Sequence, residues 1–339
     1  MKMQRGFRLL NYLFQLVETK TQFIITYEAR LKFRNEKKRF PPHSNISEKS
    51  KSLSVGILIQ GPIHDEEFIT HTIIAYCQRF ENSQIILSTW DYEDTSELER
   101  QIADKKSQVK IIKSKFPTVS SYGNLQLQQI STLNGLNALM NTGVEYAIKT
   151  RTDQRFYDPE ALQKLCSFFD LHAKNSHTIL VASQNTFYFR LFGPSDTFQF
   201  GSLEALLKYW DVDLIKYEMV DRKSSLCTNT LRGEFHKQIP ETFLFTSYLA
   251  NLGEKVEISL KESWRLLKKY VVVMDDNFID LVWTKYSHGS NRWFIYDSNS
   301  VVRQMSYSDW LVLNVEAQNN SDIEAYLDYE IKGNRFVQK

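Results

Sequence analysis

The sequence predicts an α/β protein with a mostly parallel sheet flanked by helices. Continuous apolar runs, such as SVGILIQ (54–60) and SQIILSTW (83–90), are typical of strands buried on both faces. Segments with apolar residues at helical spacing separate these runs, so that strands and helices alternate along the chain. With 339 residues, 42% of them hydrophobic, the chain is long enough for one large domain with additions.

Each element has a local signal. Three acids at 65–67 favour a helix start, Gly143 favours a helix stop, and Pro240 favours the first turn of a late helix. In chain order we predict strand 54–61, helix 65–80, strand 83–91, strand 108–116, helix 123–143, strand 146–151, strand 179–189 and helix 239–253. The helix over 123–143 is expected to face the core with Leu127, Ile130, Leu133, Leu136 and Leu139.

Positive charge is concentrated at the N-terminus. Residues 1–51 contain 12 Lys and Arg against four Asp and Glu, a net charge of +8, so the rest of the chain carries −6. We predict a basic amphipathic helix and linker over 1–50, a folded α/β domain over 51–300 and a C-terminal extension over 301–339. The apolar runs of this helix are too short to span a bilayer. It therefore either packs on the domain or lies on an anionic membrane surface. The net charge of +2 for the whole chain argues against a nucleic-acid partner.

The three cysteines, Cys77, Cys166 and Cys227, are widely spaced and form no CxxC or Cys/His cluster. Neither a zinc site nor a disulfide framework is indicated. This usage favours a reducing, cytoplasmic location.

A row of charges follows the fourth strand. Lys149, Arg151, Asp153 and Arg155 occupy every second position, so they share one face if the strand continues. Such a row is either a solvated edge or a site for an anion and its counter-ion. Ligands of parallel α/β sheets bind beyond the carboxyl ends of the strands. Asp153 there can hold a divalent cation on a diphosphate, or the arginines and Lys149 can do that work without metal.

The chain resembles the WavE-like family of lipopolysaccharide core-synthesis proteins, regarded as glycosyltransferases of GT-A type. The motifs that carry the resemblance are ILIQGPI (57–63), IILSTWDYED (85–94), NLQLQQISTLNGL (124–136), EYAIKTRTDQRFY (145–157) and GPSDTFQFGS (193–202). The resemblance implies that residues 51–300 form a GT-A-like (Rossmann-like) nucleotide-sugar transferase domain. It also implies a nucleotide-sugar donor, a glycolipid, lipopolysaccharide or polysaccharide acceptor, and work at the cytoplasmic face of a membrane. It also implies Mg²⁺ or Mn²⁺ as an expected cofactor.

The resemblance further implies roles for individual residues. The donor-binding residues are Gln60, Gly61, Pro62, Asp91, Asn124, Gln128, Arg151, Asp153 and Arg155. Asp153 and His288 are the implied metal ligands, and Glu241, followed by Asp196, is the implied catalytic base. Arg151 stands where many GT-A enzymes have the first acid of a DxD motif.

Structural explanations exist for three of these residues. Asn124 also suits a helix cap, Asp196 a turn cap, and Glu241 an acid that complements a helix dipole.

Two other functions remain open from the sequence. A nucleotidyltransferase uses a similar sheet, but such enzymes normally begin with a Gly-rich loop that bears a basic residue, and IQGPIHDEE has none. A non-catalytic module that binds a sugar or nucleotide at a membrane is the second alternative, in which Arg151 marks lost activity.

Overall fold

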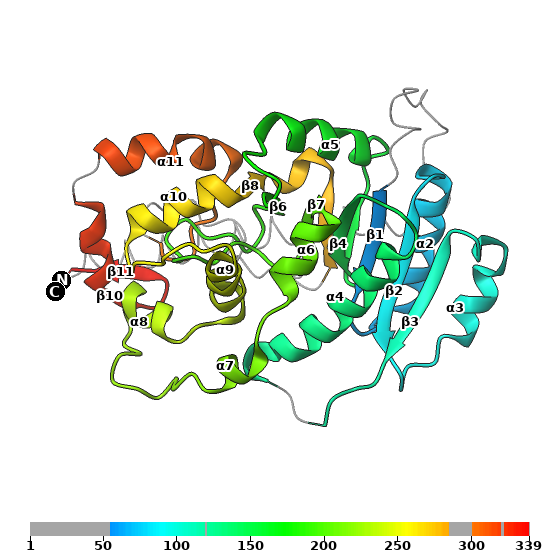
Figure 1. The fold of residues 1–339 in the computed structure, drawn as a ribbon, viewed down its shortest axis with the longest axis horizontal. Coiled ribbons are helices and arrows are strands. Elements are labelled where there is room, and N and C mark those ends of the chain that lie inside the picture. The colour runs from blue at the N-terminus through cyan, green and yellow to red at the C-terminus, as the bar shows by residue number, and fades with distance from the viewer. Residues whose placement is uncertain (1–54, 119–120, 285–299, 320–321, 339) are drawn as a thin grey trace, which may run out of the picture.

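The computed structural model describes residues 55–118, 121–284, 300–319 and 322–338. A seven-stranded sheet with the strand order β3-β2-β1-β4-β7-β6-β8 forms its centre (Figure 1). The strands of this sheet are β1 (Val55–Gln60), β2 (Gln84–Trp90), β3 (Val109–Ser114), β4 (Tyr146–Arg151), β6 (Ile179–Ala182), β7 (Gln199–Ser202) and β8 (Val271–Met274). Neighbouring strands pair in parallel, except that β7 runs antiparallel to both β4 and β6. The predicted mostly parallel α/β sheet is confirmed.

Helices cover both faces of the sheet. They are α2 (Glu66–Arg79), α3 (Ser96–Gln101), α4 (Leu125–Met140), α5 (Ala161–His172), α6 (Leu203–Trp210), α7 (Leu214–Glu218), α8 (Leu231–His236), α9 (Pro240–Asn251), α10 (Leu260–Tyr270) and α11 (Tyr307–Asn319). Short 3₁₀ turns are η3 (Ala103–Lys105), η4 (Tyr122–Asn124), η5 (Asp276–Phe278) and η8 (Ile323–Asp328). The chain steps from β1 to β2 to β3 in one direction and returns from β3 to β4. Because such crossovers are right-handed, α4 lies on the face opposite α2 and α3 (Figure 1).

Burial of their side chains stabilises the strands of the sheet. Every residue of β1 and β8 is buried, as expected of strands with helices on both faces. The start of α2 is fixed by Asp65, whose side chain accepts a hydrogen bond from the backbone N–H of Phe68 at 2.9 Å. Glu66 and Glu67 follow in the first turn, so the acidic start predicted from the sequence is confirmed.

The predicted core face of α4 is confirmed only in part, because Leu136 and Leu139 are buried in the core. Leu127, Ile130 and Leu133 are only partly buried, whereas small and polar residues on the same helix are fully covered. Gly135 shows the reason, because a Cβ atom there would lie 2.2 Å from a methyl carbon of Leu58 in β1. At Gly135 the helix therefore approaches β1 too closely for a larger side chain.

The predicted strand over 179–189 is too long. The strand ends at Ala182, and the chain then turns at Asn185, which has a φ of 65°. The Thr186 hydroxyl donates to the Ala182 carbonyl at 2.8 Å and closes this turn. Asparagine tolerates the left-handed conformation better than most residues, so it suits the position.

The row of alternating charges after β4 is also interrupted. Thr152 still donates its backbone N–H to the Gln60 carbonyl of β1 at 3.1 Å, but the Asp153 carbonyl accepts from the backbone N–H of Thr284 at 2.9 Å. From there β5 (Gln154–Phe156) pairs with β9 (Leu281–Trp283) in a separate two-stranded sheet. Arg155 consequently does not share a face with Lys149 and Arg151.

The C-terminal part of the chain packs onto this core. Helix α11 lies against α10, and the Trp310 indole N–H donates to the Val271 carbonyl of β8 at 2.8 Å. A hairpin of β10 (Glu330–Lys332) and β11 (Arg335–Val337) follows. The predicted basic helix and linker over 1–50 lie outside the described residues. Within the described ranges, no helix has the length and apolar character needed to cross a membrane.

Candidate functional site

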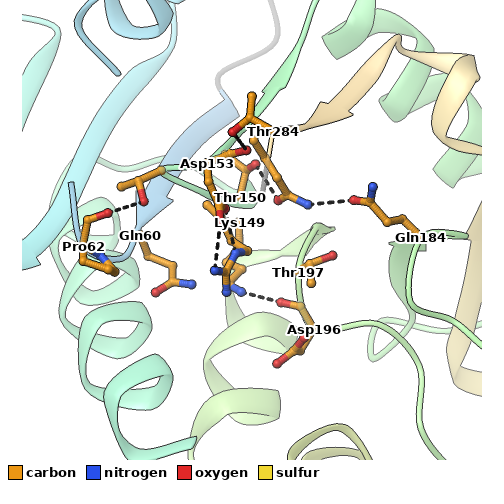
Figure 2. Close-up of polar contacts among 12 residues, drawn as sticks. Gln60, Pro62, Lys149, Thr150, Asp153, Gln184, Asp196, Thr197 and Thr284 are labelled. Atoms are coloured by element: carbon orange, nitrogen blue, oxygen red, sulfur yellow. Dashed lines mark hydrogen bonds and ion pairs between the residues drawn. The ribbon is translucent and has the colours of Figure 1, made fainter. Parts of the chain in front are cut away.

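Buried polar side chains gather where β1 and β4 end, beside the start of β7; we call this group the carboxyl-edge site. It comprises Gln60, Lys149, Thr150, Arg151, Thr152, Asp153, Gln154, Gln184, Asp196 and Thr197, most of them labelled in Figure 2. The strand order reverses its direction across the sheet between β1 and β4, and Gln60 lies opposite Arg151 in the register of this pair. Open α/β sheets bind ligands at such a switch point.

The predicted residues Gln60, Gly61 and Pro62 form the β1 side of the site. The Gln60 side-chain oxygen accepts a hydrogen bond from the Ser131 hydroxyl of α4 at 2.7 Å. Gly61 has a φ of 122°, a conformation that favours glycine, and a Cβ atom there would lie 3.2 Å from the Thr152 hydroxyl oxygen. That hydroxyl donates to the Pro62 carbonyl at 2.6 Å, so the ends of β1 and β4 are joined (Figure 2).

Arg151 and Asp153 form a two-point ion pair. Arg151 donates from Nε to Asp153 Oδ1 at 2.9 Å and from Nη2 to Oδ2 at 3.2 Å. The aspartate side chain is 8% exposed and the arginine side chain 19%. The guanidinium carbon also lies 5.3 Å from the centre of the Trp283 ring. The more accessible partner of this pair is therefore the cation, held in one orientation by a carboxylate and an aromatic ring.

Lys149 provides a second, fully buried cation. Its ammonium group donates to the backbone carbonyl of Asp196 and lies 4.7 Å from the centre of the Trp210 ring (Figure 2). Burial lowers the pKa of Lys149, because the charged form loses its hydration.

The Asp196 side chain is buried and its carboxylate is not neutralised by contact. The residue is 4% exposed. Among the described residues, no hydrogen bond or ion pair reaches its carboxylate oxygens. Burial raises the pKa of Asp196, and the nearby Glu241 charge adds to this effect. A carboxyl group in such surroundings binds a proton more readily than an ordinary aspartate, which is the property of a general base.

Glu241, the first choice for the base from the sequence, lies near Asp196 but is already engaged. It stands in the first turn of α9. Its Oε1 accepts from the Asn185 amide at 2.7 Å and lies 3.3 Å from Arg190 Nη1. These contacts suit a residue that holds a loop and orients a cation. The structure thus brings both predicted catalytic carboxylates together and distinguishes their surroundings.

Asp91, Asn124 and Gln128 lie on other elements. Asp91 follows β2 and accepts a hydrogen bond from the backbone N–H of Phe116 at 3.2 Å. Asn124 has a φ of 58° and precedes α4, so it does not share a helical face with Gln128, and its side chain makes no cap hydrogen bond. The Gln128 side-chain oxygen is buried and has no partner in the described part of the chain. An incoming polar ligand can satisfy this oxygen.

Arg155 is the one predicted donor-binding residue that the structure directs elsewhere. Its Nε donates to the Thr72 hydroxyl of α2 at 2.7 Å, and its guanidinium carbon lies 4.1 Å from the centre of the Phe68 ring. These contacts tie β5 to α2, on the face opposite Lys149.

The predicted metal ligand His288 lies outside the described residues. In the ranges described above, no group of three or more His, Cys, Asp or Glu side chains is arranged to hold a metal ion.

Several residues of the site carried no recognisable signal in the sequence. Gln184 accepts from the Gln154 amide at 3.0 Å, and Thr150 donates to the Gln154 side-chain oxygen at 3.2 Å. Asn185 lies within the stretch 179–189 that the sequence predicts as strand, and Arg190 directly follows that stretch. The Asn-Thr pair at 185–186 was the available turn signal.

A comparison with protein families gives one match for this chain. The family described as WavE lipopolysaccharide synthesis matches residues 55–339, which include all five motifs of the resemblance. The comparison with curated proteins gave no match. Because the matched residues make up most of the sequence, the chain belongs to the WavE lipopolysaccharide synthesis family.

Proposed function

We propose that this protein is a glycosyltransferase that moves a sugar from a nucleotide-sugar donor to a glycolipid, lipopolysaccharide or surface-polysaccharide acceptor. The observation that carries the proposal is the meeting of Arg151, Lys149 and the unneutralised carboxylate of Asp196 at the switch point of the sheet. Family membership in lipopolysaccharide synthesis supports the class of acceptor.

The donor lies across the ends of β1 and β4 in this proposal. Gly61 lets the backbone approach the nucleotide closely, and Arg151 faces the diphosphate. Gln60 and the unpartnered oxygen of Gln128 contribute polar contacts from the β1 end and α4. Asp91 at the end of β2 is placed for a more distant part of the nucleotide.

Asp196 is the proposed general base, in preference to Glu241. It takes the proton from the acceptor hydroxyl while that oxygen attacks the anomeric carbon of the donor sugar. The bond between the anomeric carbon and the diphosphate oxygen breaks, and its electron pair leaves with the diphosphate. Arg151 stabilises the charge that grows on this leaving group. Glu241 keeps Arg190 and Asn185 in position beside the base.

The acceptor class suggests work at the cytoplasmic face of a membrane. The net charge of +8 in residues 1–51 supports attraction to anionic lipid headgroups. Removal of residues 1–40 tests this part, and unchanged sedimentation with anionic vesicles would contradict it.

The proposal is tested by incubating the purified protein with a panel of nucleotide-sugars and measuring free nucleoside diphosphate. A transferase releases it slowly without an acceptor, and the Asp196→Asn variant is expected to lose this release. If the protein is only a binding module, neither the wild type nor Asp196→Asn releases nucleoside diphosphate. A nucleotidyltransferase instead releases pyrophosphate from a nucleoside triphosphate and a sugar phosphate.

A further inference from the structure

Asp153 is poorly suited to hold the divalent cation that a GT-A-type enzyme is expected to use. Both of its carboxylate oxygens already accept hydrogen bonds from Arg151. Its backbone carbonyl accepts from both the N–H and the hydroxyl of Thr284, at 2.9 and 3.0 Å (Figure 2). Mg²⁺ and Mn²⁺ bind oxygen ligands, and a guanidinium in direct contact with the Asp153 carboxylate repels a divalent cation.

Arg151 has the properties that the metal would otherwise provide. It carries a permanent positive charge, because an arginine does not lose its proton at physiological pH. Its orientation is fixed by Asp153 on one side and by the Trp283 ring on the other. Its planar donor groups match two phosphate oxygens at once. A cation fixed in this way stabilises a developing charge without rearranging during the reaction.

We propose that Arg151, oriented by Asp153, binds the diphosphate of the donor directly, so that donor binding does not require a divalent metal ion. Asp153 is then a positioning residue for Arg151. This inference rests on the proposed function, because it names how that site holds its donor. The negatively charged diphosphate then binds to Arg151, which stands where many GT-A enzymes have the first acid of a DxD motif.

The chain contains a matched control for this pair. Arg232 and Asp328 form an ion pair of the same geometry, with Nε to Oδ1 at 2.9 Å and Nη2 to Oδ2 at 3.2 Å. Their side chains are 41% and 66% exposed, and they join α8 to η8 away from the carboxyl-edge site. Arg232→Gln therefore removes an equivalent pair without touching the proposed donor site.

The test is titration calorimetry of the full chain with UDP, GDP, ADP and CDP and their sugar derivatives, in EDTA and in Mg²⁺ or Mn²⁺. We expect the same dissociation constant, within about twofold, in EDTA and in metal. Arg151→Gln should weaken binding at least about tenfold, which corresponds to about 1.4 kcal/mol. Arg151→Lys should weaken it less, because it keeps the charge but loses the two-point geometry. Arg232→Gln should bind as the wild type does.

The outcomes separate this inference from the function on which it rests. Binding that appears only with Mg²⁺ or Mn²⁺, or EDTA-resistant binding that survives Arg151→Gln, overturns the inference and leaves the glycosyltransferase proposal standing. Failure of every nucleotide to bind under all conditions rejects both. A titration with Mn²⁺ alone adds a readout independent of nucleotide, and a stoichiometric site lost in Asp153→Asn would also overturn the inference. Unfolding midpoints without ligand confirm that each variant is folded.

Discussion

The ammonium group of Lys149 donates its hydrogen bond to the backbone carbonyl of Asp196 and not to the Asp196 carboxylate. The buried cation therefore fixes the position of Asp196 while its side-chain oxygens stay without a direct counter-ion. Lys149 and Arg151 still act on this carboxylate at longer range and oppose the rise of its pKa. The arrangement keeps a carboxyl group that accepts protons beside two cations suited to a phosphate-bearing substrate.

Asp196→Asn should abolish turnover while leaving the donor bound, because the amide cannot take a proton. General bases typically contribute rate factors of about 10² to 10⁴, so we expect a loss of that order in kcat. Glu241→Gln should reduce kcat by less than about tenfold, since Gln can still accept from Asn185. Steady-state kinetics with the best donor measure both values. The opposite ranking, with Glu241→Gln the more damaging change, would restore Glu241 as the base.

Asp276 should make the stability of the protein depend on pH. Burial raises the pKa of Asp276 to about 7, although its Oδ1 accepts from the Ser183 hydroxyl at 3.1 Å and from the Gln184 backbone N–H at 3.0 Å. A raised pKa means that the folded state prefers the protonated acid. The stabilisation is therefore fully present below the ordinary pKa of an aspartate and is lost as the pH rises through about 7.

Asp276→Asn removes this titration and keeps an oxygen that can accept both hydrogen bonds. The variant should match the wild type near pH 4 and exceed its free energy of unfolding at pH 8 by about 4 kcal/mol. Urea unfolding at pH 4, 6 and 8 measures the difference. If the free energies of unfolding of the two proteins differ by the same amount from pH 4 to pH 8, the raised pKa of Asp276 is contradicted.

Gly61→Ala should destabilise the protein by about 1–2 kcal/mol, because it combines a φ of 122° with a Cβ atom close to Thr152. Gly143→Ala is the matched control: its φ is 78° and an added Cβ meets nothing within 4 Å. Chemical unfolding of both variants separates backbone strain from crowding at the site. If the two substitutions also weaken donor binding equally, Gly61 has no special place beside the nucleotide.

Gly135→Ala should destabilise the protein even though alanine is the better helix former. In an exposed helix this change would add about 1 kcal/mol to the stability. Here the new Cβ would lie 2.2 Å from a Leu58 methyl carbon, and overpacking typically costs about 1–3 kcal/mol. The double variant with Leu58→Val should recover part of the loss in a double-mutant cycle. A stabilised single variant would show that α4 can move away from the sheet.

The alternation of strands and helices could be predicted because β1 and β2 are largely apolar runs and clear helix signals separate the strands. The end of β6 could not, because Asn185 and Thr186 close a turn inside an otherwise apolar and aromatic stretch. On α4, Leu136 and Leu139 are buried as predicted, but Leu127, Ile130 and Leu133 are only partly buried. Helical periodicity does not reveal how closely Gly135 brings the helix to Leu58.

The site was predicted best where its residues follow strand ends directly. Gln60, Arg151 and Asp153 belong to this group, since the carboxyl ends of adjacent parallel strands meet at one edge. Arg155 was grouped with them by alternation, which fails where the Asp153 carbonyl pairs with Thr284 and the chain leaves the sheet. The spacing of residues in the sequence does not predict such a long-range backbone hydrogen bond.

The central claim is that the carboxyl-edge site binds a nucleotide-sugar. The most direct test is the thermal unfolding midpoint of the wild type, Arg151→Gln and Arg232→Gln with a panel of nucleoside diphosphates and nucleotide-sugars. A ligand at a hundred times its dissociation constant adds about 2.7 kcal/mol to the stability of the folded state. We predict a raised midpoint with one nucleotide class for the wild type and Arg232→Gln, and a much smaller rise for Arg151→Gln. An unchanged wild-type midpoint with every nucleotide would contradict the claim.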